Sequence, residues 1–444
     1  MRPKERGARR RTADENDVLI SILSGALERA WLHGGCGICM GDATASHASR
    51  ASTPAMNKHT FSSGGCPSGS AGHPARAASM IRGSGICTCA RRWWILALAS
   101  TPFAAMTQAA TYVYVSNAES CEISVLRLDP ADGSLAPVQT VSVEGQAGPL
   151  AVSPDRRFLY VALRTEPHVA QSFALDAASG RLKPLSTAPL PDRMSHLITD
   201  RSGRHLFGAS YGGHKTSISP LGDDGTVGEP AAVLLTGRHA HATLVDPSNR
   251  YVFVSALGSD VVVQWRFDAA TGRLTPSDPP TLPVRPQAGP RHLVFAPDGR
   301  FVYLLNELDA SVDVLAFDAE RGTLAPVQSL STLPEGFSGK PWAADVHLTP
   351  DGRFLYTSER TSSTLAGFSV DAQTGRLSLV SHAPTEQQPR GFRIDPSGRW
   401  LVAAGQLSHA VRVHAIDRAS GRLTPLKACP VGRGPHWVEI LSFP

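Results

Sequence analysis

From residue 111 onward, short apolar runs alternate with compact polar turns, a pattern typical of β-strands joined by tight connections. The clearest stretch predicts strands at 291–295, 301–306, 311–317 and 324–330, with turns at 297–300 and 318–323. Four consecutive strands joined by short turns form an antiparallel meander. The pattern therefore predicts a four-stranded sheet within a single stretch of about 40 residues.

This stretch belongs to a repeat that runs through the rest of the chain. Variants of Asp-x-x-Thr/Ser-Gly-Arg-Leu place a glycine every 45–53 residues, at Gly133, Gly180, Gly225, Gly272, Gly322, Gly375 and Gly421. Variants of Pro-Asp-Gly-Arg, each followed by an aromatic and apolar run, place the arginines Arg157, Arg204, Arg250, Arg300, Arg353 and Arg399. A period of this length filled with short strands is typical of β-propeller blades.

The two ends of the repeat predict how the ring closes. Residues 111–116 match the second strand of a blade and have no first strand before them. Residues 434–440 match a first strand and have no second strand after them. Joined, they complete one blade and leave no open sheet edge. We therefore predict an all-β, seven-bladed propeller over 111–444, with Cys121 and Cys429 brought into one blade.

Residues before the repeat are predicted to be leader sequence. Residues 1–79 are rich in Gly, Ser, Ala and Pro and are expected to be disordered or to lie upstream of the true translation start. Residues 80–110 show two arginines, a short apolar run and small residues, the order of a secretory signal peptide. The expected location is periplasmic or secreted. The alternative is a cytoplasmic protein whose apolar run is a first strand or a buried helix.

Composition and charge exclude several classes of protein and of binding partner. With 42% hydrophobic and 18% charged residues, the chain is neither a disordered tail nor a polytopic membrane protein. The net charge of +5 divides into +7 for residues 1–110 and −2 for the rest, which removes the main argument for nucleic acid binding. Cys36 and Cys39 have the spacing of half a zinc site, but no second pair follows them. We expect neither a nucleic acid partner nor a stable membrane span.

The predicted meander gathers polar residues at one face of the ring. First strands begin, and second strands end, at that face, while the repeated turns lie at the other face and are interpreted as structural. First-strand starts there supply Ser195, His196, His241, Arg291, His292, Asp345, His347, Arg390 and His436. Second-strand ends supply Asn117, Arg164, Tyr211, Asn306, Glu307, Glu359, Arg360 and Gln406. The alternative to a binding site is a channel mouth filled by water and ion pairs.

These residue types suit the binding of an anion and the activation of water. Arg291, Arg360 and Arg390 can fork onto phosphate or carboxylate oxygens, while Glu307 or a neighbouring His can activate a water molecule. The motifs H-E-x-x-H and G-x-G-x-x-G are absent from the sequence, and we predict no nucleophile elbow. No metal is assigned, although Asn306, Glu307, Asp345 and His side chains are types that hold hard cations.

Several motifs resemble those of the bacterial propeller-type 6-phosphogluconolactonases, the lactonase family related to carboxymuconate lactonizing enzymes. They are Gly289-Pro-Arg-His292, Asn306-Glu-Leu308, Trp342-Ala-Ala-Asp-Val-His347, Gln388-Pro-Arg-Gly-Phe392 and Gly405-Gln-Leu-Ser-His409. The resemblance covers residues 111–441 and implies hydrolysis of 6-phospho-glucono-1,5-lactone to 6-phosphogluconate without a required cofactor. That phosphosugar is cytosolic, so an exported chain would be expected to act on another lactone, such as an unphosphorylated sugar lactone.

The resemblance maps a pocket onto His241, Arg291, His292, Glu307, Asp345, His347, Arg360 and Arg390. We assign catalytic roles to Glu307, His292, His347 and Asp345. Substrate binding is assigned to Arg291, Arg360, Arg390, His241, Asn306, Gln406 and Arg164. The expected partner is a small-molecule lactone. The alternatives are a muconate-type cycloisomerase that uses the same arginines on carboxylates, and a non-catalytic binding propeller.

Overall fold

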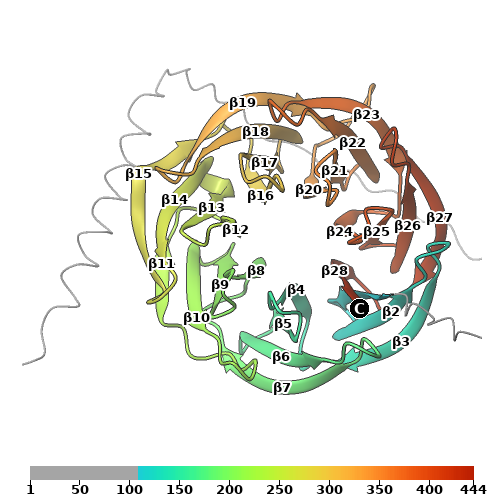
Figure 1. Ribbon diagram of the computed structural model, residues 1–444, viewed down its shortest axis with the longest axis horizontal. Helices are drawn as coiled ribbons and strands as arrows, with labels where there is room; N and C mark the ends of the chain where they lie inside the picture. The colour runs from blue at the N-terminus through green and yellow to red at the C-terminus, as the bar shows by residue number, and fades with distance from the viewer. Residues whose placement is uncertain (1–108) are drawn as a thin grey trace, which may run out of the picture. The chain divides into compact units, whose positions relative to one another are not determined.

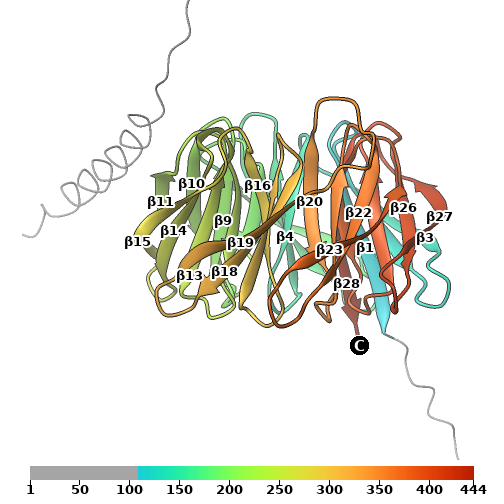
Figure 2. The ribbon, with the colours of Figure 1, turned by 90° about the horizontal axis from the view of Figure 1, so that it is seen from above.

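The structure is a computed structural model, and it describes residues 109–444. In these residues seven four-stranded antiparallel sheets stand around a central channel (Figure 1). Seen from the side, the strands run between two faces of the ring (Figure 2). The predicted leader and all but the last two residues of the predicted signal segment fall outside the described residues, and Ala110 begins β1. The predicted seven-bladed, all-β propeller is confirmed.

Each blade has one strand against the channel and three further strands outward from it. The innermost strands are β28 (Pro435–Phe443), β4 (Ala147–Val152), β8 (His196–Thr199), β12 (Ala240–Val245), β16 (Pro290–Phe295), β20 (Ala343–Leu348) and β24 (Pro389–Ile394). The second strands are β1 (Ala110–Asn117), β5 (Phe158–Leu163), β9 (His205–Ser210), β13 (Tyr251–Ala256), β17 (Phe301–Asn306), β21 (Phe354–Glu359) and β25 (Trp400–Gly405).

The outer half of each blade is more exposed than the inner half. The third strands are β2 (Glu122–Leu128), β6 (Val169–Leu175), β10 (Lys215–Pro220), β14 (Val261–Asp268), β18 (Ser311–Asp318), β22 (Thr364–Val370) and β26 (Ala410–Ile416). The outermost strands are β3 (Leu135–Ser142), β7 (Leu182–Pro189), β11 (Ala232–Leu235), β15 (Arg273–Pro283), β19 (Thr323–Ser331), β23 (Leu377–Pro384) and β27 (Leu423–Pro430). In the β16–β19 blade the observed bounds lie within one residue of the predicted strands.

The ring closes as predicted, by pairing of the two ends of the propeller. Strand β28 pairs antiparallel with β1, and the register joins Thr111 to Ser442. Cys121 lies in the turn between β1 and β2, but Cys429 lies in β27 of the neighbouring blade, and both are free. The prediction that they share a blade is therefore wrong. The reason is that the C-terminus adds only the innermost strand β28, so Cys429 belongs to the blade before it.

The two repeated signatures hold neighbouring blades together. Gly180 adopts a φ of +69°, and a Cβ there would collide with the Tyr112 ring of the preceding blade. The Tyr114 hydroxyl donates to the Gly180 carbonyl at 2.9 Å. Arg353 of the other signature lies over Phe354 and donates to the Arg418 carbonyl at 3.0 Å. These turns therefore have the structural role that the sequence indicated.

Among the described residues, no helix has the length and apolar character needed to cross a bilayer. The only helical element in this part of the chain is the short 3-10 turn η1 (Leu257–Ser259).

Candidate active site

A β-bulge near the start of the innermost strands aims side chains at one mouth of the channel. The register shifts between Ala240 and Ala242, between Pro290 and His292, and between Pro389 and Gly391. A bulge inserts one residue without a partner and redirects its side chain. The inserted residues are His241, Arg291 and Arg390. The local backbone thus explains why three predicted site residues face the same space.

The mouth encloses a cavity of about 660 Å³. It is lined by Arg164, Glu166, His168, Asp192, Arg193, Met194, Ser195, Tyr211, Gly212, His241, Glu307, Trp342, Arg360, Arg390 and His436. Five of the eleven assigned site residues are in this lining: Arg164, His241, Glu307, Arg360 and Arg390. A concave site with converging charged groups is the usual form of a small-molecule site.

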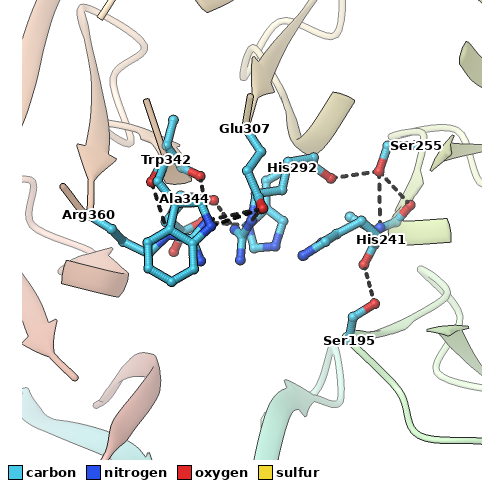
Figure 3. Close-up of polar contacts among 12 residues, drawn as sticks. Ser195, His241, Ser255, His292, Glu307, Trp342, Ala344 and Arg360 are labelled. Atoms are coloured by element: carbon cyan, nitrogen blue, oxygen red, sulfur yellow. Dashed lines mark hydrogen bonds and ion pairs between the residues drawn. The ribbon is translucent and has the colours of Figure 1, made fainter. Parts of the chain in front are cut away.

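Glu307 is held at the centre of this cavity wall by three donors (Figure 3). Arg291 Nε donates to Glu307 Oε2 at 2.7 Å, and Arg360 Nη2 lies 3.0 Å from the same oxygen. The indole Nε1 of Trp342 donates to Glu307 Oε1 at 3.2 Å. The Arg360 guanidinium also lies over the Trp342 ring, 3.8 Å from its centroid. The carboxylate is therefore fixed in position from several sides.

Positive charges outnumber negative charges around Glu307, and this imbalance shifts the pKa values of the side chains there. Burial opposes ionisation of Glu307, but Arg291, Arg360 and Arg390 outweigh it and lower its pKa. Burial, followed by repulsion from Arg291, lowers the pKa of Arg360 to about 9. Burial, followed by repulsion from Arg291 and Arg360, also lowers the pKa of Arg390 well below its usual range. Three guanidinium groups facing one carboxylate favour the entry of an anion.

His241, which lines the same part of the cavity, is neutral. Burial and then Arg291 hold the pKa of His241 well below its ordinary value. Its ring projects from β12 toward the space beside Glu307 (Figure 3). The Ser195 hydroxyl donates to the His241 carbonyl at 2.8 Å, which fixes the strand at this point.

Three of the residues predicted to be catalytic form a separate buried group in the channel wall. Asp345 Oδ1 accepts from His292 Nδ1 at 2.7 Å, and Asp345 Oδ2 lies 3.2 Å from His347 Nε2. Burial opposes ionisation of Asp345, but both imidazoles hold its pKa well below the usual range. Burial and Arg291 lower the pKa of His292 to about 4. None of the three lines the cavity, although the His292 ring centroid lies 5.2 Å from that of His241.

Three predicted substrate-binding residues, Arg291, Asn306 and Gln406, do not line the cavity. Arg291 is buried and contacts Glu307 of the cavity wall. The Asn306 amide donates to Ser311 Oγ at 2.9 Å and to Asp313 Oδ2 at 2.7 Å, within its own blade. Gln406 is half-buried, and its backbone N–H donates to the Gln388 carbonyl at 3.1 Å. Within residues 109–444 no group of three or more His, Cys, Asp or Glu side chains is arranged to hold a metal ion.

Comparisons with known proteins place the chain in a family. The sequence model of the family described as "Lactonase, 7-bladed beta-propeller" matches residues 107–440. The chain belongs to this lactonase family. Its relatives include the 6-phosphogluconolactonase of Pectobacterium carotovorum, which is 45% identical over 330 residues, or 74% of this chain and 98% of the relative. The 6-phosphogluconolactonase of Serratia proteamaculans is 44% identical over the same shares.

A solved structure agrees with this lactonase assignment. The periplasmic gluconolactonase of Pseudomonas aeruginosa matches with a TM-score of 0.71 and 32% identity, covering 76% of this chain and all of that one. The resemblance inferred from the motifs is confirmed. So is the predicted class of enzyme, a carboxylic ester hydrolase of the lactonase type.

The cavity of this lactonase is also lined by residues that were not predicted from the sequence, among them Trp342 and Arg193. Trp342 was quoted as part of a motif but not assigned to the site, although its position just before β20 was a usable signal. Arg193 lies in the connection before β8, which carries no repeated motif to mark it. Tyr211 and His436 were among the residues gathered at the mouth, and the structure places both in the cavity wall.

Proposed function

We propose that this lactonase opens 6-phospho-glucono-1,5-lactone to 6-phosphogluconate by adding water to the ring carbonyl. The observation that carries the proposal is the placing of three guanidinium groups around one ionised carboxylate in the cavity wall. The names of the relatives support the reaction and the phosphosugar. An anionic substrate would also compensate the excess positive charge of Arg291, Arg360 and Arg390.

In the proposed reaction Glu307 orients the water and takes one of its protons. The hydroxide adds to the carbonyl carbon, and guanidinium groups stabilise the oxyanion that forms. The bond from that carbon to the ring oxygen then breaks, and Glu307 returns the proton to the leaving oxygen. The product acid ionises at neutral pH and releases one proton to solvent.

Substrate binding itself would improve Glu307 as a base. In the empty site the arginines lower its pKa, which weakens its affinity for a proton. A bound anion neutralises part of that positive charge, so the pKa of Glu307 rises when the substrate is present. Neutral His241 offers a hydrogen-bonding group beside the same space. We assign His292, Asp345 and His347 to positioning this wall, because they do not line the cavity.

The test is lactone hydrolysis by the purified full chain, measured against spontaneous ring opening. We expect Glu307→Gln to lower kcat for 6-phospho-glucono-1,5-lactone by at least about a hundredfold. Asp298→Asn, in an exposed turn at the opposite face, is the matched control and should retain full activity. A wild-type protein that leaves the spontaneous rate unchanged would refute the proposed activity and would favour the non-catalytic binding propeller.

We also propose that residues 80–110 direct export, and this bears on the substrate. The neighbour named a periplasmic gluconolactonase supports the proposal. N-terminal sequencing of the natural protein tests it. A mature start near residue 110 supports export and favours an unphosphorylated lactone as substrate. An N-terminus that retains the apolar run contradicts export and favours the phosphorylated lactone.

A further inference from the structure

The cavity wall has two chemically different arcs. One arc carries Glu307, Arg360, Trp342 and His241 on the blades of β12, β16 and β20. The other lies on the blades of β24, β28, β4 and β8 and carries Arg390, His436, Arg164 and Arg193. We call this second set the basic arc. The innermost strands follow one another around the channel in that order (Figure 1), so the basic arc faces the Glu307 wall across the cavity.

The arginines of the basic arc have no counter-ion of their own. In the part of the chain that the structure describes, the guanidinium groups of Arg164, Arg193 and Arg390 form no hydrogen bond or ion pair with another residue. Arg390 is also repelled by Arg291, Arg360 and Arg193. Arg164 and Arg390 are half-buried, whereas Arg193 is exposed at the rim of the cavity. Half-buried cations without a partner are costly, so such a group is expected where an anion binds.

Neither of the two carboxylates in this part of the wall pairs with an arginine of the basic arc. Asp192 lies 3.2 Å from Lys215 Nζ and accepts from the backbone N–H of Arg193 at 2.7 Å. The side chain of Glu166 is 88% exposed and lies 3.9 Å from His168, a contact that is ionic only when this histidine is protonated. Neither pair involves an arginine side chain of the basic arc. The positive charge of the arc is therefore directed at the cavity rather than cancelled within the wall.

The backbone makes room for one of these arginines. The stem of Arg164 crosses Gly148 of β4, where a Cβ would lie 3.0 Å from Arg164 Cγ and 2.5 Å from the Ala162 carbonyl oxygen. Any larger residue at 148 would displace the arginine. The missing side chain at this innermost-strand position lets an arginine of the second strand reach the cavity.

We propose that Arg164, Arg193 and Arg390 form a phosphate subsite that selects a phosphorylated sugar lactone. The inference rests on the proposed lactone hydrolysis and adds the orientation of its substrate. The lactone carbonyl lies against Glu307, and the phosphate at the far end of the sugar lies against the basic arc. A phosphate dianion offers three oxygens, which suits forked contacts from several guanidinium groups.

The experiment compares kcat/KM for 6-phospho-glucono-1,5-lactone and for glucono-1,5-lactone in the wild type, Arg164→Ala and Arg193→Ala. The ratio of the two values, phosphorylated over unphosphorylated, should fall about tenfold in each variant. Arg238→Ala is the matched control, because Arg238 is exposed beside the mouth but does not line the cavity. It removes the same charge and should leave the ratio unchanged.

Each other outcome has a defined meaning. Equal losses for both lactones, or no loss for either, would overturn the subsite while leaving lactone hydrolysis intact. A wild type that hydrolyses only the unphosphorylated lactone would also overturn the subsite. Failure of the wild type on both lactones would instead count against the proposed function itself. Circular dichroism of each variant identifies a loss that is due to misfolding, and Arg193→Lys, which retains the charge, should recover part of the ratio.

Discussion

Replacing Glu307 by Gln should destabilise the folded ring, because it removes the negative charge shared by two buried arginines. The side chains of Arg291 and Arg360 are only 2% and 1% exposed, so water screens their charges weakly. Both lie within 3.0 Å of Glu307 Oε2, at 2.7 and 3.0 Å. Glutamine keeps the shape and one acceptor oxygen but leaves both guanidinium groups uncompensated.

The size of the expected loss in unfolding free energy follows from the typical contribution of a buried ion pair. Removing one partner of a buried ion pair typically costs 3–5 kcal/mol, and the glutamine oxygen retains part of the hydrogen bonding. We therefore expect Glu307→Gln to lower the free energy of unfolding by about 3 kcal/mol at pH 7. The control is Asp298→Asn, since Asp298 and Arg300 form an exposed pair at 2.8 Å with side chains 43% and 55% exposed. That change should cost less than about 1 kcal/mol.

Urea denaturation followed by tryptophan fluorescence measures both variants. A Glu307→Gln protein as stable as the Asp298→Asn control would refute the reasoning, because the buried arginines would then not need the carboxylate. Added phosphate offers a second readout. An anion that occupies the place of the missing charge should restore part of the lost stability of Glu307→Gln and have a smaller effect on the control.

Two further predictions concern the same residues and the buried histidines. Trp342→Phe keeps a ring beside Arg360 but removes the N–H that donates to Glu307 Oε1. The pKa of Glu307 should therefore rise, and the acid limb of the pH profile of kcat/KM should move to higher pH. An acid limb at the same pH as in the wild type would contradict this role of Trp342. Burial lowers the pKa of His292 and of His414 to about 4, so stability present above pH 6.5 should decline as pH falls toward 4. Between pH 7 and 5 each histidine should account for about 2 kcal/mol of lost unfolding free energy, and constant stability over that range would be inconsistent with neutral buried imidazoles.

The blade count and the closure were predictable from the sequence because their signals are local and repeated. Gly180 needs a positive φ and a close approach to Tyr112, and the same requirement recurs in other blades. The strands between the turns alternate with them at nearly constant spacing, so each blade supports the interpretation of the others. Cys429 lies in β27, before the first strand that the repeat marks at 434–440, so the repeat already assigns this cysteine to the preceding blade.

The face on which the site lies was predictable, but the direction of individual side chains was not. Asn306 and Glu307 are adjacent at the end of β17, yet Asn306 turns to Ser311 and Asp313 while Glu307 lines the cavity. The place of a residue within the four-stranded meander determines whether it lies at the mouth of the channel. The hydrogen bonds available around it determine whether its side chain enters the cavity or stays within the blade.

A closed ring of seven sheets with a polar mouth is thus predictable from the residues alone, because strand and turn preferences act over a few residues and repeat. Which charges meet at that mouth depends on how the blades pack. Arg291 comes from the same blade as Glu307, whereas Trp342 and Arg360 come from the next blade. They share Glu307 because consecutive blades pack side by side. The separation of a Glu307 wall from a basic arc likewise depends on the order of blades around the channel, which no local pattern contains.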